Sequence, residues 1–323
     1  MSTLRSLAVA ACTLGTAFAQ DADLRIGLIG LDTSHVVAFT RVLNDPAHKD
    51  HLKGGRVVAA YRGGSPDMPL SANRIDGFTA ELKKYPEIVF HDTIASLVAA
   101  VDAVMILSVD GRIHLEQARQ VLPARKPVFI DKPFAASLAD AREIVRLARE
   151  HGTPLFSTSS RRYSPTLPPV LKATEGKVRA VLSYGPMQIE PNHPDLFFYG
   201  IHAVEGLYTV LGPGCVSLQR THTADTDVVT GVWPDGRVGT VHGIRNAKAP
   251  FGMIVFGADG PVREDADMSY VPMLQDVLTF FRTGVSPVPL ETTLEIIAFM
   301  EAAEESKRRG GAPVALAPIT GAR

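Results

Sequence analysis

The chain has 323 residues, of which 46% are apolar, a length and composition sufficient for two domain-sized cores. Its 33 Lys and Arg residues nearly balance its 34 Asp and Glu residues, and the basic residues form no cluster. Neither a nucleic acid nor an anionic membrane surface is therefore an expected partner, and the charge balance favours a small-molecule ligand.

The N-terminus has the pattern of a secretory signal peptide. Arg5 precedes a short apolar run over residues 7–18, and Ala17-Phe-Ala19 forms a small-residue cleavage site. We expect residues 1–19 to be removed and the mature protein to be periplasmic or secreted. The run is too short to span a bilayer, so we expect no membrane span.

Strands and helices alternate through the first half of the chain. Apolar strands are predicted at residues 26–29, 56–61, 103–108, 128–131 and 155–157, with helices between them that include residues 114–122 and 138–150. Continuous apolar strands separated by helices are typical of a parallel sheet covered on both faces. The sequence therefore predicts an α/β, Rossmann-like doubly wound domain over residues 23–159.

The second half has a different pattern. Residues 178–184, 226–233, 237–244 and 252–256 alternate apolar and polar side chains, and helices are predicted at 165–173, 274–282 and 292–308. Such alternation is typical of an antiparallel sheet with one packed face. We expect residues 160–323 to form an α+β domain with a mainly antiparallel sheet.

The opening segment LRIGLIGLDTSH, residues 24–35, has the order of a dinucleotide-binding unit: an apolar strand, Gly30 in a tight turn, then a helix whose N–H groups point at a pyrophosphate. Two of the three glycines of that motif are replaced, the second by Asp32 and the third by His35. A carboxylate at a helix N-terminus can cap the N–H groups itself and compete with a bound anion. The segment therefore predicts the scaffold together with a weakened dinucleotide site.

Three further motifs follow in a specific order. A strand ends in Asp131-Lys132-Pro133, a segment reads Arg162-Tyr-Ser-Pro165, and a helix opens with Gly200-Ile-His202-Ala-Val-Glu205. This order resembles the Gfo/Idh/MocA family of glucose-fructose oxidoreductases and inositol dehydrogenases. The resemblance implies an NAD(P)-linked oxidoreductase that acts on a sugar or polyol in a site between the domains.

The resemblance also implies roles for individual residues. Lys132 would hydrogen-bond the reacting substrate oxygen, and His202 would be the general acid/base. The implied substrate residues are Arg162, His193 and Glu205. Phe198 stands where family members often place an Asp, which leaves the proton relay incomplete. The exposed face of the second sheet is the implied surface of a homo-oligomer.

The cofactor positions that the resemblance implies are Gly27, Gly30, Asp32, His35, Arg62, Ser108, Asp110, His114 and Asp131. The acidic residue expected after the second strand, where it would bind the adenosine ribose, is absent, and Tyr61 and Arg62 occupy the place. Because Arg62 and Ser65 can accept a 2′-phosphate, NADP is slightly favoured over NAD.

The same region permits two other interpretations. His193, Asp195, His202 and Glu205 fall within sixteen residues, and the last two share one helical face. They could hold a divalent metal, and with Lys132 as base such a site would suit a non-redox lyase, epimerase or hydrolase acting on an oxidised sugar. A third hypothesis is an inactive dehydrogenase fold kept as a carbohydrate-binding module.

Overall fold

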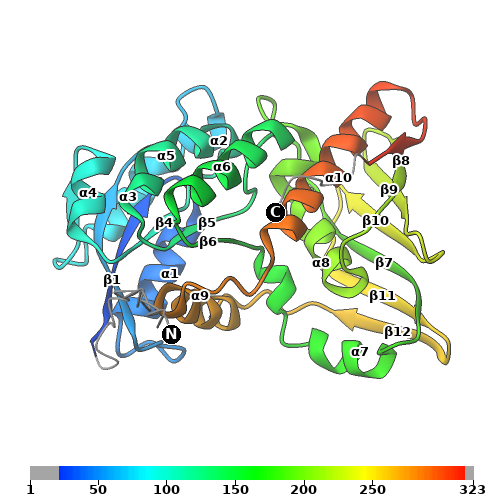
Figure 1. Ribbon diagram of the computed structural model, residues 1–323, viewed down its shortest axis with the longest axis horizontal. Helices are drawn as coiled ribbons and strands as arrows, with labels where there is room; N and C mark the ends of the chain where they lie inside the picture. Colours follow the sequence, from blue (N-terminus) through cyan, green and yellow to red (C-terminus); the bar gives the residue numbers. More distant parts are fainter. Residues whose placement is uncertain (1–21, 317–323) are drawn as a thin grey trace, which may run out of the picture.

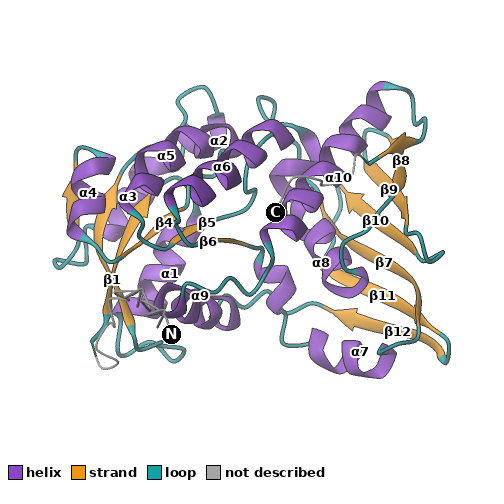
Figure 2. Cartoon of the chain, viewed as in Figure 1, coloured by secondary structure: helices purple, strands orange, loops and turns teal. Residues whose placement is uncertain are grey.

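Two β-sheets lie side by side in the computed structural model, which describes residues 22–316, and helices cover both sheets (Figures 1 and 2). The predicted signal peptide, residues 1–19, lies outside the described residues. No helix within residues 22–316 is long and apolar enough to cross a membrane.

The first sheet is the predicted doubly wound one. Its six parallel strands have the order β3-β2-β1-β4-β5-β6. The strands are β1 (Leu24–Ile29), β2 (Gly55–Tyr61), β3 (Val89–His91), β4 (Ala103–Ile106), β5 (Val128–Ile130) and β6 (Leu155–Ser157). The strand order reverses between β1 and β4, and ligands of such sheets bind at the carboxyl ends of the strands beside this point.

Helices cover both faces of the first sheet. They are α1 (Ser34–Asn44), α2 (Pro69–Ala72), α3 (Ile75–Leu82), α4 (Ile94–Ala100), α5 (His114–Val121) and α6 (Leu138–His151), with the 3₁₀ turns η1 (Gly111–Ile113) and η2 (Leu122–Ala124). The predicted ends of α6 are confirmed: Ser137 caps its first turn, and Gly152 ends it with a φ of 66°.

One helix from the second half of the sequence returns to the first sheet. Helix α9 (Val271–Thr283) lies beside α1 beneath this sheet (Figure 1). Its Met273, Leu274 and Val277 are buried in one apolar cluster with Phe39 of α1. The chain therefore returns to the first domain after β12 and crosses back to the second domain with α10 and β13.

The second sheet is mixed but mainly antiparallel, as predicted. Its order is β12-β11-β7-β10-β9-β8-β13, and only the β7–β10 pair is parallel. The strands are β7 (Val178–Pro186), β8 (Ser217–His222), β9 (Thr226–Val232), β10 (Val238–Ile244), β11 (Gly252–Gly257), β12 (Gly260–Asp265) and β13 (Val314–Ala315).

Two long helices pack on one face of this sheet. They are α8 (Ile201–Leu211) and α10 (Leu290–Arg308), which contact β7, β8 and β10. The remaining helical segments are η3 (Ser160–Tyr163), α7 (Leu167–Thr174) and a π-helical turn, η4 (Leu196–Gly200), which leads directly into α8. The two domains contact each other where α10 packs on α6 and β6, and where η4 and α8 bring Tyr199 and His202 close to Lys132 after β5.

Candidate active site between the two domains

Lys132 lies two residues after the end of β5, and its side chain enters the space between the domains. Its backbone N–H donates to Asp131 Oδ1 over 2.8 Å, and its Nζ lies 5.6 Å from the centre of the Tyr199 ring. Burial lowers the pKa of the Lys132 ammonium, while the Asp131 carboxylate raises it. A charge on Lys132 is therefore poorly solvated, and in such a place charge acts strongly on a bound group.

His202 approaches the same ring from α8. Its Nδ1 lies 2.6 Å from Ser159 Oγ, and the rings of Tyr199 and Phe251 each lie edge-on at 5.2 Å. Burial, followed by the charge of Lys132, lowers the pKa of His202 well below its ordinary value of 6.5. The imidazole is therefore neutral at neutral pH and is ready to accept a proton.

Tyr199 lies against both predicted catalytic side chains, so the structure brings Lys132 and His202 to one site. Sequence reasoning missed Tyr199, Ser159 and Phe251, which line that site. The one sequence feature that could have indicated Tyr199 is its position directly before Gly200, where the motif that contains His202 begins. The π-helical turn η4 that carries Tyr199 is a type of distortion often found at functional sites.

The predicted substrate residues Arg162 and Glu205 form an ion pair in the wall of this site. Arg162 Nε and Thr158 Oγ1 both donate to Glu205 Oε1. A cavity of about 10 Å³ lies beside Lys132, Thr158 and Glu205, which is about the space of one water molecule. The pair is therefore a positioning element of the site wall, and the site is narrow in this conformation.

His193 lies apart from this group. Its Nδ1 bonds the Pro194 carbonyl, and its Nε2 is buried with no hydrogen-bond partner in residues 22–316. Burial lowers the pKa of His193, and the charges that act on it are those of Asp110, Arg112 and His114. The structure therefore places His193 beside the loop after β4.

The structure does not assemble the alternative metal site, which is a correction to the sequence interpretation. Asp195 forms ion pairs with Arg220 and Lys307, and Glu205 is bonded by Arg162. Within residues 22–316, no group of three or more His, Cys, Asp or Glu side chains is placed to hold a metal ion. Closeness in sequence failed here because the side chains of the four residues point to different partners.

The glycine turn after β1 keeps the backbone of a dinucleotide-binding unit. Gly30 has a φ of 87°, and a Cβ there would lie 2.1 Å from Ser108 Oγ, so only glycine fits. Gly27 has a different role from the one predicted, since a Cβ on it would strike Leu97 of α4 at 2.6 Å. Gly27 therefore allows close packing of helix on strand.

Asp32 does not cap α1, contrary to the sequence expectation. Thr33 is the N-cap residue, and its Oγ1 accepts from the N–H of His35. Asp32 is fully buried and turns away from the helix: its Oδ2 accepts from Ser71 Oγ over 2.6 Å, and its Oδ1 accepts from the Val109 N–H over 3.0 Å. The carboxylate therefore joins the turn to two other loops.

The third glycine position is also filled. His35 Nδ1 lies 2.5 Å from Asp131 Oδ2, and the imidazole stacks on Phe39 and meets Tyr270 edge-on. Although burial raises the pKa of Asp131, His35 and Lys132 hold it below its ordinary value. This contact connects α1 to the strand end that carries Lys132.

The remaining predicted cofactor residues bond to neighbouring protein groups. Arg62 pairs with Asp76 at the surface, and Asp110 is held by Arg112. Ser108 lies in the loop after β4 and His114 begins α5; the Ser108 carbonyl is 2.8 Å from His114 Nε2, and Ser108 Oγ bonds Gln117.

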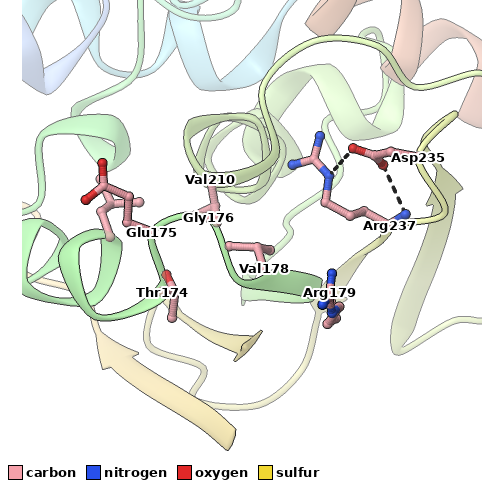
Figure 3. A pocket seen from close by; sticks show the side chains of 9 residues that line it. Thr174, Glu175, Gly176, Val178, Arg179, Val210, Asp235 and Arg237 are labelled. Atoms are coloured by element: carbon pink, nitrogen blue, oxygen red, sulfur yellow. Dashed lines mark hydrogen bonds and ion pairs between the residues drawn. The ribbon is translucent and has the colours of Figure 1, made fainter. Parts of the chain in front are cut away.

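A separate cavity of about 470 Å³ lies on the second domain (Figure 3). It is lined by Leu171, Thr174, Glu175, Gly176, Val178, Arg179, Val210, Asp235 and Arg237. Arg237 Nε donates to Asp235 Oδ2 over 2.7 Å, so its charge is already partnered. This cavity contains none of the predicted site residues.

Residues 24–159 match the oxidoreductase family described by the Gfo/Idh/MocA NAD-binding Rossmann fold. The first domain of the chain is therefore similar to the Gfo/Idh/MocA family. The inositol 2-dehydrogenase of Gluconacetobacter diazotrophicus is 34% identical over 118 residues, which cover 36% of this chain and 34% of that protein. The uncharacterised oxidoreductase YhhX of Escherichia coli is 31% identical over 111 residues, which cover 31% of this chain and 32% of that protein. The chain thus aligns with about a third of the length of each.

Solved structures match over both domains. The myo-inositol 2-dehydrogenase of Lactobacillus plantarum superposes with a TM-score of 0.74 at 18% identity, covering 92% of this chain and 100% of that one. The myo-inositol dehydrogenase of Lactobacillus casei, solved with NAD(H) and myo-inositol, gives 0.73 at 18% identity, covering 93% and 98%. These likenesses confirm the predicted two-domain fold.

The family's cofactor is NAD(P), and the backbone of the glycine turn fits that group. In this conformation side chains cover the pyrophosphate position. Residues 26–33 are all buried, and Asp32 stands where a glycine would let a pyrophosphate approach. The turn would hold NAD(P) through Gly30 and the first N–H groups of α1 once Asp32 and the segment covering it have moved.

Proposed function

We propose that the chain is an NAD(P)-linked oxidoreductase acting on a hydroxyl or carbonyl group of a sugar or polyol. The observation that carries the proposal is the meeting of Lys132 and His202 at the Tyr199 ring, in a buried site between the domains. The inositol dehydrogenases among the relatives and structural neighbours support a polyol as the substrate class.

The chemistry follows from the protonation states of the two side chains. NAD(P), when bound, exchanges a hydride with the substrate carbon. His202 is neutral and accepts the proton of the reacting hydroxyl, and Ser159 fixes its ring through Nδ1. The Lys132 ammonium stabilises negative charge on the same oxygen.

NADP is the dinucleotide that we propose from the ribose end of the site. Strand β2 ends at Tyr61, which offers no carboxylate to a ribose, and Arg62 follows it at the surface. A cavity of about 160 Å³ is lined by Arg62, Gly63, Gly64, Ser65, Pro66, Ser71, Ala72 and Ile75. A 2′-phosphate bound there would replace Asp76 as the anion that pairs with Arg62.

The test measures dinucleotide-dependent oxidation of a panel of inositols and aldoses by the mature chain. Lys132→Met and His202→Ala should each lower turnover about a hundredfold or more, the usual effect of removing a positioned acid or base. The matched control is Lys172→Met on α7. Near-normal turnover in Lys132→Met contradicts the proposal, and polyol binding by the wild type without turnover supports the binding-module hypothesis.

A second candidate function is a non-redox acid–base enzyme acting on an oxidised sugar without bound dinucleotide. The filling of both glycine positions by Asp32 and His35 favours it. The discriminating measurement is proton NMR of a keto-inositol in D₂O with no dinucleotide added. Deuterium entering beside the carbonyl in the wild type, and not in His202→Ala, supports this candidate; its absence counts against it.

Export and assembly complete the proposal. We propose that cleavage after Ala19 releases the mature chain into the periplasm or medium, which mass spectrometry of the secreted form tests by a start at Gln20. We also propose that the open face of the second sheet joins copies of the chain, since the large apolar side chains of Val232 and Phe256 are about 40% exposed there. Light scattering of the wild type and Phe256→Glu tests this.

A further inference from the structure

The segment after β2, residues 62–71, lies directly over the glycine turn. The N–H of Gly30 donates to the Tyr61 carbonyl over 3.1 Å, and the N–H of Leu31 donates to the Arg62 carbonyl over 2.8 Å. A Cβ on Gly63 would come within 3.3 Å of Gly30 Cα, so the two backbones are nearly in contact. Residues 62 and 63 therefore pack directly on the glycine turn.

Ser71 and Asp32 close this arrangement. The Ser71 hydroxyl donates to Asp32 Oδ2 over 2.6 Å and accepts from the N–H of Ser65 over 2.8 Å. Asp32 and Ser71 are both completely buried. One hydroxyl therefore holds residues 65–71 in their loop and fixes the loop to the turn.

Two more contacts hold the segment at its middle. Arg112 donates from both terminal nitrogens to the Asp67 carboxylate, over 2.9 and 3.0 Å, and Asn192 Nδ2 donates to the Asp67 carbonyl. The Met68 side chain is buried with Val109 and Phe198 in a small apolar cluster. Phe198 and Asn192 belong to the second domain, so both domains hold the segment in place.

We infer that Asp32 and residues 62–71 form a latch over the pyrophosphate position, and that a dinucleotide binds this chain only in competition with the latch. The Asp32 carboxylate engages the Ser71 O–H and the Val109 N–H, which are donors of the kind that a phosphate oxygen accepts. Opening the latch moves Ser71 away with the covering segment and frees the Val109 N–H. This inference rests on the proposed NAD(P)-linked function.

The competing explanation is simple repulsion between Asp32 and the pyrophosphate. Ser71→Ala separates the two, because it breaks the latch without altering any charge. If the latch limits binding, Ser71→Ala should lower the Kd for NADPH about tenfold, the scale of one hydrogen bond to a charged group. Repulsion alone predicts no change in Ser71→Ala and tighter binding in Asp32→Asn.

The experiment titrates NADPH and NADH into the mature wild type, Ser71→Ala, Asp32→Gly and Asp32→Asn and follows nucleotide fluorescence. Ser96→Ala on α4 is the serine control, and thermal melts show which variants are folded. Hydrogen exchange by mass spectrometry provides the second readout. Bound NADPH should speed exchange in residues 62–72 of the wild type, whereas most ligands slow exchange where they bind.

Each outcome decides the inference. Tighter binding in Ser71→Ala with faster exchange in residues 62–72 supports the latch. Equal NADPH affinity in the wild type and Ser71→Ala overturns the latch and leaves the proposed function standing. Failure of every folded variant to bind either dinucleotide overturns both, in favour of the non-redox candidate.

Discussion

Protonation of His202 should destabilise the folded chain below pH 6.5. The buried imidazole has a pKa well below 6.5 in the folded state and an ordinary pKa in the unfolded state. Between these two values only the unfolded chain binds the proton, so the free energy of unfolding falls by about 1.4 kcal/mol for each pH unit. The loss therefore grows as the pH falls below 6.5, and it becomes negligible well above that pH.

His202→Asn should remove this part of the acid sensitivity, because an amide near the Nδ1 position can still bond Ser159 but does not titrate. The assay is urea unfolding at several pH values from 7.5 to 5.0, comparing the wild type, His202→Asn and the control His151→Gln at the end of α6. His193, whose pKa is also lowered by burial, contributes equally to all three proteins. Identical pH slopes for the wild type and His202→Asn would refute a buried, neutral His202.

Three other substitutions test the site and the junction between domains. Glu264→Gln should lower the free energy of unfolding by about 3–5 kcal/mol, because Arg161 and Glu264 form a fully buried ion pair and Arg161 would keep an uncompensated charge; a thermal melt measures this. Asp131→Asn should lower the pKa of Lys132 further, since it removes the carboxylate that raises it, and ¹⁵N NMR of the lysine follows the shift. Gly30→Ala should destabilise the fold by at least about 1–3 kcal/mol through its positive φ, seen as a lower urea midpoint.

The sequence predicted the two sheets because their signals are local. Apolar runs between helical segments identified the parallel strands, and alternation identified the antiparallel ones. That Lys132 and His202 lie at one site was implied by the family resemblance, through one short motif after a strand and another at the start of a helix. The structure adds the Tyr199 ring, which neither motif contains.

The role of Asp32 was beyond local reasoning. Its position in the glycine motif led to the prediction of a weakened dinucleotide site, but its partner Ser71 is 39 residues away in the sequence. No periodicity or turn pattern relates the two. Burial decided the outcome, because a fully buried carboxylate must find donors and the loop over the turn supplies them.

The metal hypothesis failed for a related reason. Four candidate ligands lie within sixteen residues, but Asp195 pairs with Arg220, a buried cation on β8 that also bonds Asp227 and Glu304. A buried guanidinium needs several acceptors, and Asp195 is one of those that Arg220 binds, so its carboxylate is not available to a metal ion beside His202. The spacing of residues along one segment does not reveal that a buried cation on a distant strand will pair with one of them.

The latch and the acid–base site are connected through one more charge. Arg74 precedes α3, three residues beyond the covering segment, and burial lowers its pKa while the charges of Asp32 and Glu190 raise it. The charge of Arg74 in turn lowers the pKa of Lys132. Asp32 is therefore connected to Lys132 through Arg74, because its charge acts on the pKa of Arg74 and the charge of Arg74 acts on the pKa of Lys132. A carboxylate in place of one glycine thus links the state of the cofactor turn to the acidity of Lys132.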